Sequence, residues 1–443
     1  MEGKQLMIHG FSKKSRDEKL NMIANGCADG NKAAAVLKSF HHQDNATQKL
    51  LEEFSENTIT NFPLPYNICP NMLINGKNYM VPMVIEESSV VAAAAHSAKY
   101  WFSRGGFTTE VVATEKIGQV HFLWKDDKAL LTVRFPELKE RLVKECFEIT
   151  ENMVKRGGGI LDIQLRDLSA QEPGLMQLYA TFDTVDSMGA NFINSCLEQF
   201  AATFRQWHAA QKEFKEDGLE VIMCILSNYT PNCLVRCHVE TSLDRMDNIL
   251  DGMSGAEFAR RFRLGVRVAE LDPHRATTHN KGIMNGVDAV VLATGNDFRA
   301  VEACSHTYAS RQGRYTSLSH VRIEDNLFRF EVELPFALGV VGGLTSLHPL
   351  VKLSLELLGH PSATELMSIA AAAGLANNFS AVKNLVTVGI QQGHMKMHLL
   401  NILKQLNIPD NHKEEVILYF KDKVVSVSAV RNLAERWKLI ATS

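Results

Sequence analysis

Two side chains of opposite charge, Lys281 and Asp297, stand among glycines, amides and apolar residues in the segment Arg275–Asp297. Such flanks hold a cation and a carboxylate partly out of water, where an unpaired charge costs several kcal/mol. We therefore predict that the two side chains are neighbours in one site. Lysines on solvated faces are the commoner case, so the spacing alone leaves a purely structural alternative open.

An acidic pair, Glu86 and Glu87, follows the strand-like residues 79–85 and precedes Ser88, Ser89 and a helix of small residues. A carboxylate between a strand and a helix N-terminus is a candidate general acid or base. The alternative is that a serine caps the helix while the glutamates favour its positive end.

A second junction, Asp186-Ser-Met-Gly-Ala-Asn191, joins a predicted strand to a predicted helix. Backbone N–H groups at the start of a helix can bind a phosphate or a ribose. A plain cap by Asp186, with Gly189 needed for packing, explains the same residues, and both interpretations stay open.

Two histidines near the C-terminus, His394 and His398, share one face if their segment is helical. They could be half of a metal site in a metal-dependent hydrolase, but the glutamate of an HExxH motif does not accompany them. A histidine beside Gly393 could instead protonate a leaving group near neutral pH, and solvated histidines are the third interpretation. Cys233-x3-Cys237-His238 lacks a second ligand pair at zinc spacing, so we predict no metal there.

The elements that position these residues belong to more than one domain, because 443 residues exceed the roughly 250–300 that one hydrophobic core holds. Apolar residues make up 45% of the chain and charged residues 22%, as in ordinary globular proteins. Basic and acidic residues nearly cancel, at 47 against 50, without a basic tract, which disfavours nucleic acid as a partner.

The cellular compartment is predicted from cysteine usage and from hydropathy. Eight cysteines without a CxxC pair favour a reducing compartment. Residues 1–11 lack the apolar core and cleavage site of a signal peptide, and no run of 18 apolar residues follows. We therefore expect a soluble, cytoplasmic protein that does not bind a membrane.

A small α+β unit is predicted in the middle of the chain, with helices on one face of an antiparallel sheet. Its expected order is β-β-α-β-β-α, with strands at 119–124, 129–135, 161–168 and 175–185, and helices from Pro136 and from Gly189. It is not a Rossmann fold, because no G-x-G-x-x-G occurs. Around it we expect short helices over residues 12–56, a buried helix from Val90, and a charged helical segment from about residue 386.

Several segments, in the same order over nearly the whole chain, resemble 3-hydroxy-3-methylglutaryl-CoA (HMG-CoA) reductase, specifically its soluble class II form. The matching segments are Glu56-Asn-Thr-Ile-Thr, Glu86-Glu-Ser-Ser-Val-Val-Ala-Ala, Arg104-Gly-Gly-Phe-Thr-Thr, Asp186-Ser-Met-Gly-Ala-Asn, Ile225-Leu-Ser-Asn228, Thr278-His-Asn-Lys-Gly-Ile-Met-Asn-Gly, Ala293-Thr-Gly-Asn-Asp, Gly342-Gly-Leu-Thr-Ser-Leu-His-Pro and Gly393-His-Met. The family's Glu-Glu-Pro-Ser and Asp-Ala-Met-Gly differ here at Ser88 and Ser187, and neither change removes a catalytic group.

The resemblance implies two successive hydride transfers from NAD(P)H to the thioester carbon, giving mevalonate and free coenzyme A without a metal. Its catalytic quartet falls on Glu87, Lys281, Asp297 and His394. Lys281 would stabilise the developing oxyanion and Asp297 would hold and polarise that lysine. Glu87 would supply a proton when mevaldehyde is reduced, and His394 would protonate the departing thiolate from a C-terminal segment that closes over the substrate.

Substrate contacts implied by the resemblance are Ser89, Asn228, Arg275 and Asn285, with Arg275 gripping the free carboxylate through paired donors. Residues on the cofactor side are Asp186, Met188, Gly189 and Asn191.

The nucleotide preference is predicted from position 150. Some NADH-dependent members of the family carry an aspartate seven residues before the Gly-Gly-Gly, where it would bind a ribose hydroxyl and repel a 2′-phosphate. That position is Thr150 here, with Lys155 and Arg156 nearby to pair with a phosphate. The sequence therefore favours NADPH, with NADH as the alternative.

The expected architecture is a large, mainly helical substrate domain of residues 1–112 and 228–385, a small ferredoxin-like cofactor domain of residues 113–227, and a mobile helical C-terminal flap of residues 386–443. In the family the site lies between subunits, so we expect a homodimer or a multiple of dimers. A CoA-ester-binding protein that has lost catalysis is the alternative, and retention of all four catalytic positions argues against it.

Overall fold

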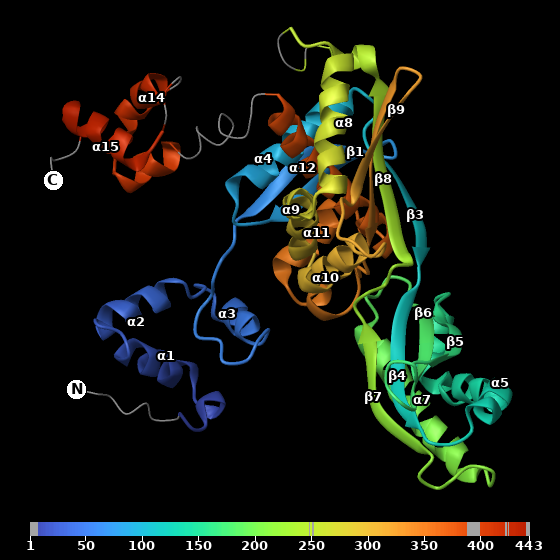
Figure 1. Cartoon of the computed structure of the whole chain (residues 1–443). Helices are drawn as coiled ribbons and strands as arrows, with labels where there is room; N and C mark the ends of the chain where they lie inside the picture. Colours follow the sequence, from blue (N-terminus) through green and yellow to red (C-terminus); the bar gives the residue numbers. More distant parts are fainter. Residues whose placement is uncertain are drawn as a thin grey trace.

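The computed structural model describes residues 8–247, 249, 252–387, 399–420, 423 and 425–439. The chain begins with short helices, as predicted: η1 (Phe11–Lys13), α1 (Arg16–Asn25), α2 (Gly30–Ser39) and α3 (Asn45–Glu52). In Figure 1 these helices form a separate group below the body of the molecule. Side-chain caps explain where they start, because Ser15, Asp29 and Asp44 each accept a hydrogen bond from the backbone three residues later.

We call the large unit around the main hydrophobic core the body of the molecule. It begins with the hairpin of β1 (Tyr66–Ile74) and β2 (Lys77–Val84). Its turn, Asn75-Gly76, has positive φ at both residues, which suits asparagine and glycine and the right-handed twist of the strands. Helix α4 (Ser88–Phe102) follows directly, as predicted from its small residues. This order places Glu87 between a strand and a helix.

A four-stranded antiparallel sheet forms the second half of the body, in the order β3-β8-β10-β9. Its strands are β3 (Thr108–Thr114), β8 (Cys233–Ser242), β9 (Ser319–Glu324) and β10 (Leu327–Pro335). Around it lie η2 (Leu243–Met246), α8 (Gly255–Leu271), α9 (Pro273–Ala293), α10 (Phe298–Ala309), η3 (Gly343–Ser346), α11 (Pro349–Leu357) and α12 (Ala363–Val386). Cys233 and Cys237 are buried in this core, where burial raises the pKa of both thiols.

Helix α12 is the buried axis of the body and packs along α9. The two helices approach closely because glycines face the partner: a Cβ at Gly286 would lie 2.2 Å from the Ala373 carbonyl oxygen, and one at Gly374 would lie 2.7 Å from Val287 Cγ2. Close packing of this kind fixes α9 against the core, and with it the backbone position of Lys281.

The small unit contains β4 (Lys116–Trp124), α5 (Lys128–Glu145), α6 (Phe147–Val154), β5 (Gly159–Asp167), β6 (Leu175–Asp183), α7 (Ala190–Ala210) and β7 (Leu219–Ser227). Its antiparallel sheet has the order β5-β6-β4-β7. The chain order β-α-β-β-α-β is that of ferredoxin-like units. Figure 1 shows that the chain passes from β3 of the body into β4 of this unit and returns from β7 into β8. Two chain connections therefore join this unit to the body.

One predicted strand is wrong. Residues 129–135 belong to helix α5, which starts where the Asp127 carboxylate accepts a hydrogen bond from the Ala129 N–H. Leu131, Leu138 and Leu142 are fully buried at helical spacing in the core shared with α7. That packing outweighs Pro136, which lies inside the helix instead of opening it.

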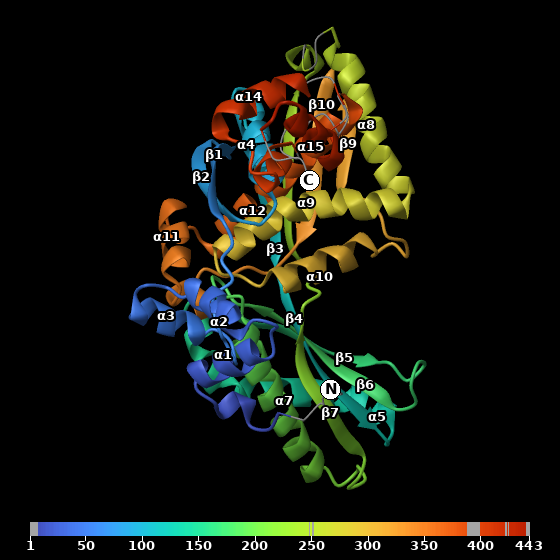
Figure 2. The same ribbon diagram turned by 90° about the vertical axis from the view of Figure 1, so that its left-hand side faces the viewer.

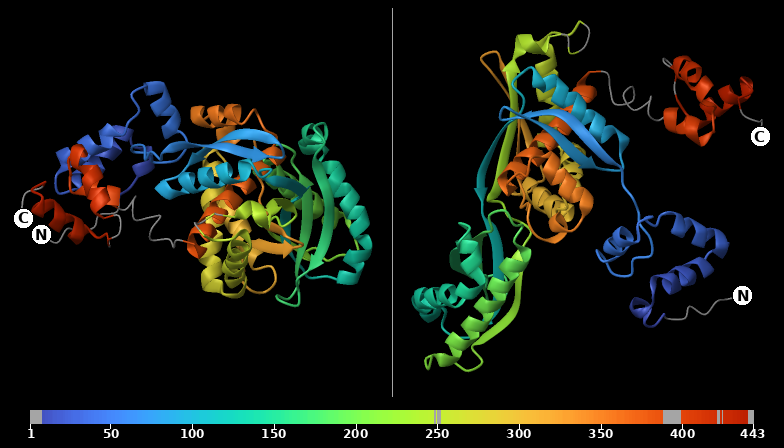
Figure 3. Two further views of the ribbon diagram at one scale, coloured as in Figure 1. Left: turned by 90° about the horizontal axis from the view of Figure 1, so that it is seen from above. Right: turned by 180° about the vertical axis from the view of Figure 1, so that it is seen from behind.

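The C-terminal part has a small core of its own, formed by residues of 399–439. Its elements include α14 (Asp410–Tyr419) and α15 (Val427–Arg436), which confirms the predicted helical character. Figures 2 and 3 show this group and the N-terminal helices from further sides. Over the described ranges, no helix combines the length and the hydropathy needed to cross a membrane.

Candidate active site

Lys281 is placed by helix α9, which starts where the Asp272 carboxylate accepts a hydrogen bond from the His274 N–H and where Pro273 occupies the first turn. The side chains of Lys281 and Asn285 lie one turn apart, outside the buried stripe that packs on α12. The helix therefore presents an ammonium group and an amide on the same accessible face.

Glu87 meets that ammonium group from the N-terminus of α4. Its Oε2 lies 2.9 Å from Lys281 Nζ, and its Oε1 accepts a hydrogen bond of 2.8 Å from the Ser89 hydroxyl. Glu87 itself is the N-cap residue of α4, without a side-chain cap bond, so neither serine acts as the predicted cap. The two charged side chains are 38% and 61% exposed, and an exposed pair contributes at most about 1 kcal/mol to stability. A gain in stability alone therefore does not explain why a lysine and a glutamate from distant segments are paired at this position.

Asp297 lies at the start of α10, where its carboxylate accepts hydrogen bonds from the N–H groups of Arg299 and Ala300. It also forms an ion pair of 3.1 Å with the Arg299 guanidinium, and that hydrogen bond is the main reason why the pKa of Asp297 is lowered. In the described part of this chain Lys281 pairs with Glu87, and the expected direct contact with Asp297 is not formed. Asp297 has its charge satisfied locally, by its own helix and by Arg299.

The residue before Asp297 connects this region to the predicted cofactor segment. Asn296 forms two hydrogen bonds with Gly339, at 2.8 and 3.0 Å. On the other side of Gly339, the Asp186 carbonyl oxygen accepts a hydrogen bond from the Val340 N–H, and a Cβ at Gly339 would lie 2.5 Å from Met188 N. The turns that hold Asp297 and Asp186 are therefore fixed to the same short segment.

Asp186 does not cap α7. Its carboxylate accepts a hydrogen bond of 2.8 Å from the Ala363 N–H at the start of α12. The N-cap of α7 is Gly189, at φ 88°, and it makes no side-chain cap bond. The first N–H groups of α7, near the exposed Asn191, thus lack a side-chain cap of the kind that would compete with a phosphate.

Asn228 and Met188 line the same small cavity of about 30 Å³ between the small unit and the body, next to Ala300 and Val301 of α10. The structure thus brings one substrate-side and one cofactor-side residue together near Asp297. Arg275, on the first turns of α9, is half-buried, and burial lowers the pKa of its guanidinium. No carboxylate of the described residues forms an ion pair with it, which suits a residue that binds an anionic ligand.

Comparison with known proteins identifies the family of this chain. A family model described as hydroxymethylglutaryl-coenzyme A reductase matches residues 15–399. The 3-hydroxy-3-methylglutaryl-coenzyme A reductase of Archaeoglobus fulgidus is 35% identical over 434 residues, which cover 97% of this chain and 94% of that protein. The chain belongs to the hydroxymethylglutaryl-coenzyme A reductase family. The resemblance found in the sequence motifs is thereby confirmed.

Solved structures agree with this assignment. The class II HMG-CoA reductase of Streptococcus pneumoniae bound to NADPH is 34% identical, with a TM-score of 0.72, covering 96% of this chain and 100% of that one. Among the sequence relatives, a probable HMG-CoA reductase of Borreliella burgdorferi is 33% identical over 380 residues, which cover 85% of this chain and 84% of that protein. The mixed α+β fold is that of the class II enzymes. As a member of the family, the chain is an NAD(P)H-dependent oxidoreductase that reduces HMG-CoA to mevalonate.

Position 150, which carries the expected nucleotide preference, is in helix α6. Thr150 is 5% exposed, and its hydroxyl donates to the carbonyl oxygens of Cys146 and Phe147, at 3.1 and 3.3 Å. Lys155 pairs with Glu151 at 2.8 Å, and Arg156 donates to the Asn152 carbonyl oxygen. Thr150 is thus bound to its own helix and carries no charge, while two cations lie just beyond the helix end.

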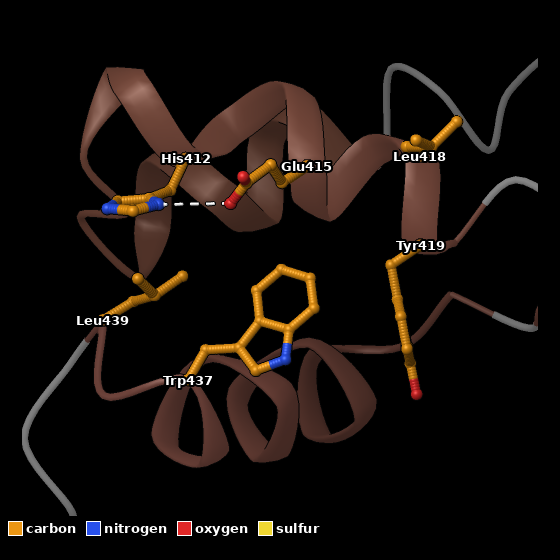
Figure 4. Close-up of a pocket in the computed structure, with 6 residues that line it drawn as sticks. All are labelled: His412, Glu415, Leu418, Tyr419, Trp437 and Leu439. Carbon is orange, nitrogen blue, oxygen red and sulfur yellow. Dashed lines mark hydrogen bonds and ion pairs between the residues drawn. The ribbon is translucent and has the colours of Figure 1, made fainter.

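His394 and His398 lie outside the described residues. The C-terminal unit beyond them has a pocket of about 600 Å³, and Figure 4 draws the side chains that line it. Among them, His412 Nδ1 lies 3.4 Å from Glu415 Oε2. None of the predicted site residues lines it. Over the described residues, no group of three or more His, Cys, Asp or Glu side chains could hold a metal ion.

Sequence reasoning missed polar residues on the last turns of α9 and on α10. Asp288 interrupts the apolar end of α9, and Glu302 and His306 lie one turn apart on α10, where they contact each other. An aspartate inside the run Val287–Ala293 was the available signal. The segment at Gly339 was also missed, because nothing in its local pattern indicates which distant residues it binds.

Proposed function

We propose that Lys281, Glu87 and His394 divide the work of two successive reductions, with Lys281 stabilising the oxyanion in both. The contact between Lys281 and Glu87 carries this proposal, because it places a cation and a proton donor at one accessible point. When bound, NAD(P)H supplies one hydride to the thioester carbon and a second to the aldehyde carbon.

Lys281 acts on the oxygen of the carbon that is reduced. As the C=O electron pair moves onto that oxygen, the ammonium group offers a fixed positive charge and N–H donors. Its side chain is 61% exposed in the free chain, so a substrate oxygen can reach it without displacing the core. Closure over the substrate would remove water and strengthen the interaction.

Glu87 supplies the proton that completes the second reduction. The aldehyde carbon gains a hydride, its oxygen gains the electron pair, and that oxygen takes the proton of the Glu87 carboxyl to give the alcohol. The Ser89 hydroxyl holds Glu87 by donating to its Oε1, which leaves Oε2 beside Lys281. Ser89 therefore orients the acid as well as standing near the substrate.

Arg275 binds the free carboxylate of the substrate. A guanidinium offers two parallel N–H donors to a carboxylate, and half-burial strengthens that interaction. Asn285 lies between Arg275 and the end of α9, one turn beyond Lys281, where its amide can orient the substrate hydroxyl or carbonyl. Asn228 lines the cavity at the junction with the small unit, beside Met188, and its role as a substrate contact follows from the family resemblance.

His394 protonates the thiolate of coenzyme A after the carbon–sulfur bond breaks, which prevents the thiolate from adding back to the aldehyde. The assignment rests on the family motif Gly393-His-Met. The histidine belongs to the stretch between α12 and the C-terminal helices, and we propose that these helices act as a mobile flap. Residues 1–112 and 228–385 then form the substrate domain, and 113–227 the cofactor domain.

Asp297 completes the quartet when two chains associate. In one chain it pairs with Arg299 and not with Lys281, and the family resemblance places the site between subunits. We propose a homodimer or a multiple of dimers in which the Asp297 carboxylate comes near a lysine ammonium and polarises it. A monomeric preparation is expected to be inactive.

NADPH is the proposed cofactor, held at the junction by the turn Asp186–Asn191. The uncapped start of α7 suits a diphosphate, and the close approach of Gly339 to Met188 shapes the turn. Lys155 and Arg156 would attract a 2′-phosphate, and Thr150 brings no negative charge to repel it. The cytoplasm is the proposed compartment, where reducing conditions suit the free cysteines.

The reaction is tested by mixing the purified protein with HMG-CoA and either NADPH or NADH, following cofactor oxidation and thiol release together. Two cofactors oxidised for each thiol released are expected, with faster oxidation of NADPH. One cofactor for each thiol, or thiol release without oxidation, would contradict the two-step reduction.

A further inference from the structure

Asp186 binds the body with two different groups, although it follows strand β6 of the small unit. Its carboxylate Oδ1 accepts a hydrogen bond of 2.8 Å from the Ala363 N–H, at the first residue of α12. Its backbone carbonyl oxygen accepts another hydrogen bond of 2.8 Å, from the Val340 N–H. The residue therefore holds the turn Asp186–Asn191, which is the proposed cofactor turn, against two separate segments of the body.

The backbone just before Asp186 adopts a conformation that its residue type disfavours. Val185 has φ 50°, in the left-handed region that β-branched residues rarely enter. Its N–H donates a hydrogen bond of 2.7 Å to the Asp183 carboxylate at the end of β6. A strained conformation of this kind persists only where surrounding contacts fix it, and such conformations gather at functional sites. The two hydrogen bonds from the body to Asp186 are contacts that fix it.

Asn296 holds the same part of the body from the turn that carries Asp297. Its amide oxygen accepts a hydrogen bond of 2.8 Å from the Gly339 N–H, and its amide nitrogen donates one of 3.0 Å to the Gly339 carbonyl oxygen. The cofactor turn approaches from its own side so closely that a Cβ at Gly339 would lie 2.5 Å from the backbone nitrogen of Met188. Residues 339–340, which we call the linking segment, therefore contact both turns.

We infer that Asp186 and Asn296 are positioning residues, which together lock the cofactor turn to the turn that carries Asp297. This role rests on the proposed cofactor site, and it commits the Asp186 carboxylate to α12 and not to the nucleotide. Hydride transfer needs reacting atoms about 3–3.5 Å apart, and a displacement of about 1 Å can cost about 100-fold in rate. A rigid link between the small unit and the body keeps that distance when the nucleotide and the thioester are bound.

Asp186→Ala and Asp186→Asn separate positioning from direct binding of the nucleotide. Asparagine keeps an oxygen that can accept the Ala363 N–H but removes the negative charge, whereas alanine removes both. Asp186→Ala is expected to weaken NADPH binding, measured by fluorescence titration without HMG-CoA, by about tenfold. Asp186→Asn is expected to lose much less affinity than Asp186→Ala. Equal losses in the two variants would show that the carboxylate acts through its charge, and would overturn the inference.

Asn296→Ala tests the other end of the link. It is expected to raise the KM for NADPH and to lower kcat, with little change in the KM for HMG-CoA, because the distance between the two sites is disturbed and not the thioester site itself. Since both residues hold the linking segment, the loss of NADPH affinity in the double variant with Asp186→Ala is expected to be smaller than the product of the two single losses. Losses that multiply would show independent action and overturn the inference.

Hydrogen exchange measures the link without relying on the cofactor. The N–H groups of Val340 and Ala363 are expected to exchange about tenfold faster in Asp186→Ala than in the wild type, and much less so in Asp186→Asn. Unchanged exchange in folded Asp186→Ala would contradict the inference, and exchange at Gly339 in Asn296→Ala gives the same test if Asp186→Ala does not fold. If the wild type bound neither NADPH nor NADH, the proposed cofactor site would fail while the exchange result still stood, so the two failures are distinguishable.

Discussion

The ammonium nitrogen of Lys281, on α9, lies 2.9 Å from a carboxylate oxygen of Glu87, at the N-terminus of α4. The two residues are 194 positions apart in the sequence. The β1–β2 hairpin, which ends at Val84 just before Glu87, and the packing of α9 on α12 bring them together. Their exposure and the hydrogen bond from Ser89 leave the pair open to a substrate.

Glu87→Gln tests whether this carboxyl group is a proton donor. The amide keeps the size and a hydrogen bond but cannot give a proton, so mevaldehyde reduction is expected to fall by about 10²–10⁴-fold. The Tm is expected to change little, because an exposed ion pair contributes at most about 1 kcal/mol. Steady-state kinetics and thermal unfolding measure the two effects.

The matched control is Glu86→Gln, since the neighbouring Glu86 is exposed and forms no ion pair among the described residues. It is expected to keep near wild-type kcat and Tm. If Glu87→Gln reduced the Tm strongly while mevaldehyde turnover was kept, Glu87 would be a structural residue and its assignment as the acid would be wrong.

His394→Gln separates the two halves of the reaction. Protonation of the thiolate is needed only after the thioester has been reduced, so the variant is expected to lose HMG-CoA reduction while keeping most of its activity on added mevaldehyde. His398→Gln serves as the control and is expected to affect neither. Equal losses on both substrates would argue against the thiolate role, and inactivation by a chelator would favour the metal-dependent alternative.

Thr150→Asp tests the cofactor preference. An aspartate is expected to shift the ratio of kcat/KM values toward NADH, by repelling the 2′-phosphate and binding the ribose hydroxyl. Because Thr150 is buried and its hydroxyl is bound by its own helix, the replacement also carries a packing effect, for which Thr150→Asn is the control. An Asp variant with the same ratio as the Asn variant would remove the argument from position 150.

The local parts of the site could be predicted from the sequence, and the contacts between distant parts could not. Lys281, Asn285 and the capped start of α9 follow from helical periodicity and from Asp272-Pro273. Whether Lys281 faced Asp297 or Glu87 depended on how α4, α9 and α10 pack, which charge and spacing do not determine. Among the described residues Lys281 pairs with Glu87 and Asp297 with Arg299, and the expected Lys281–Asp297 contact is not found, although both residues belong to the matched family motifs.

The same limit applies to the small unit. Residues 129–135 combine apolar and β-branched side chains in a pattern typical of a strand, and Pro136 is typical of a helix start. The structure forms a helix from Lys128 instead, because this conformation buries Leu131 and Leu138 against α7. Pro136 is tolerated inside that helix. Tertiary packing outweighed local propensity there.

The most direct test of the account is the turnover of Lys281→Ala on HMG-CoA and on mevaldehyde, with circular dichroism and Tm to show that the variant folds. Because the lysine stabilises the oxyanion in both reductions, we expect both rates to fall by about 10²-fold or more, with the Tm nearly unchanged. Near wild-type turnover of either substrate by the folded variant would contradict the central role of Lys281.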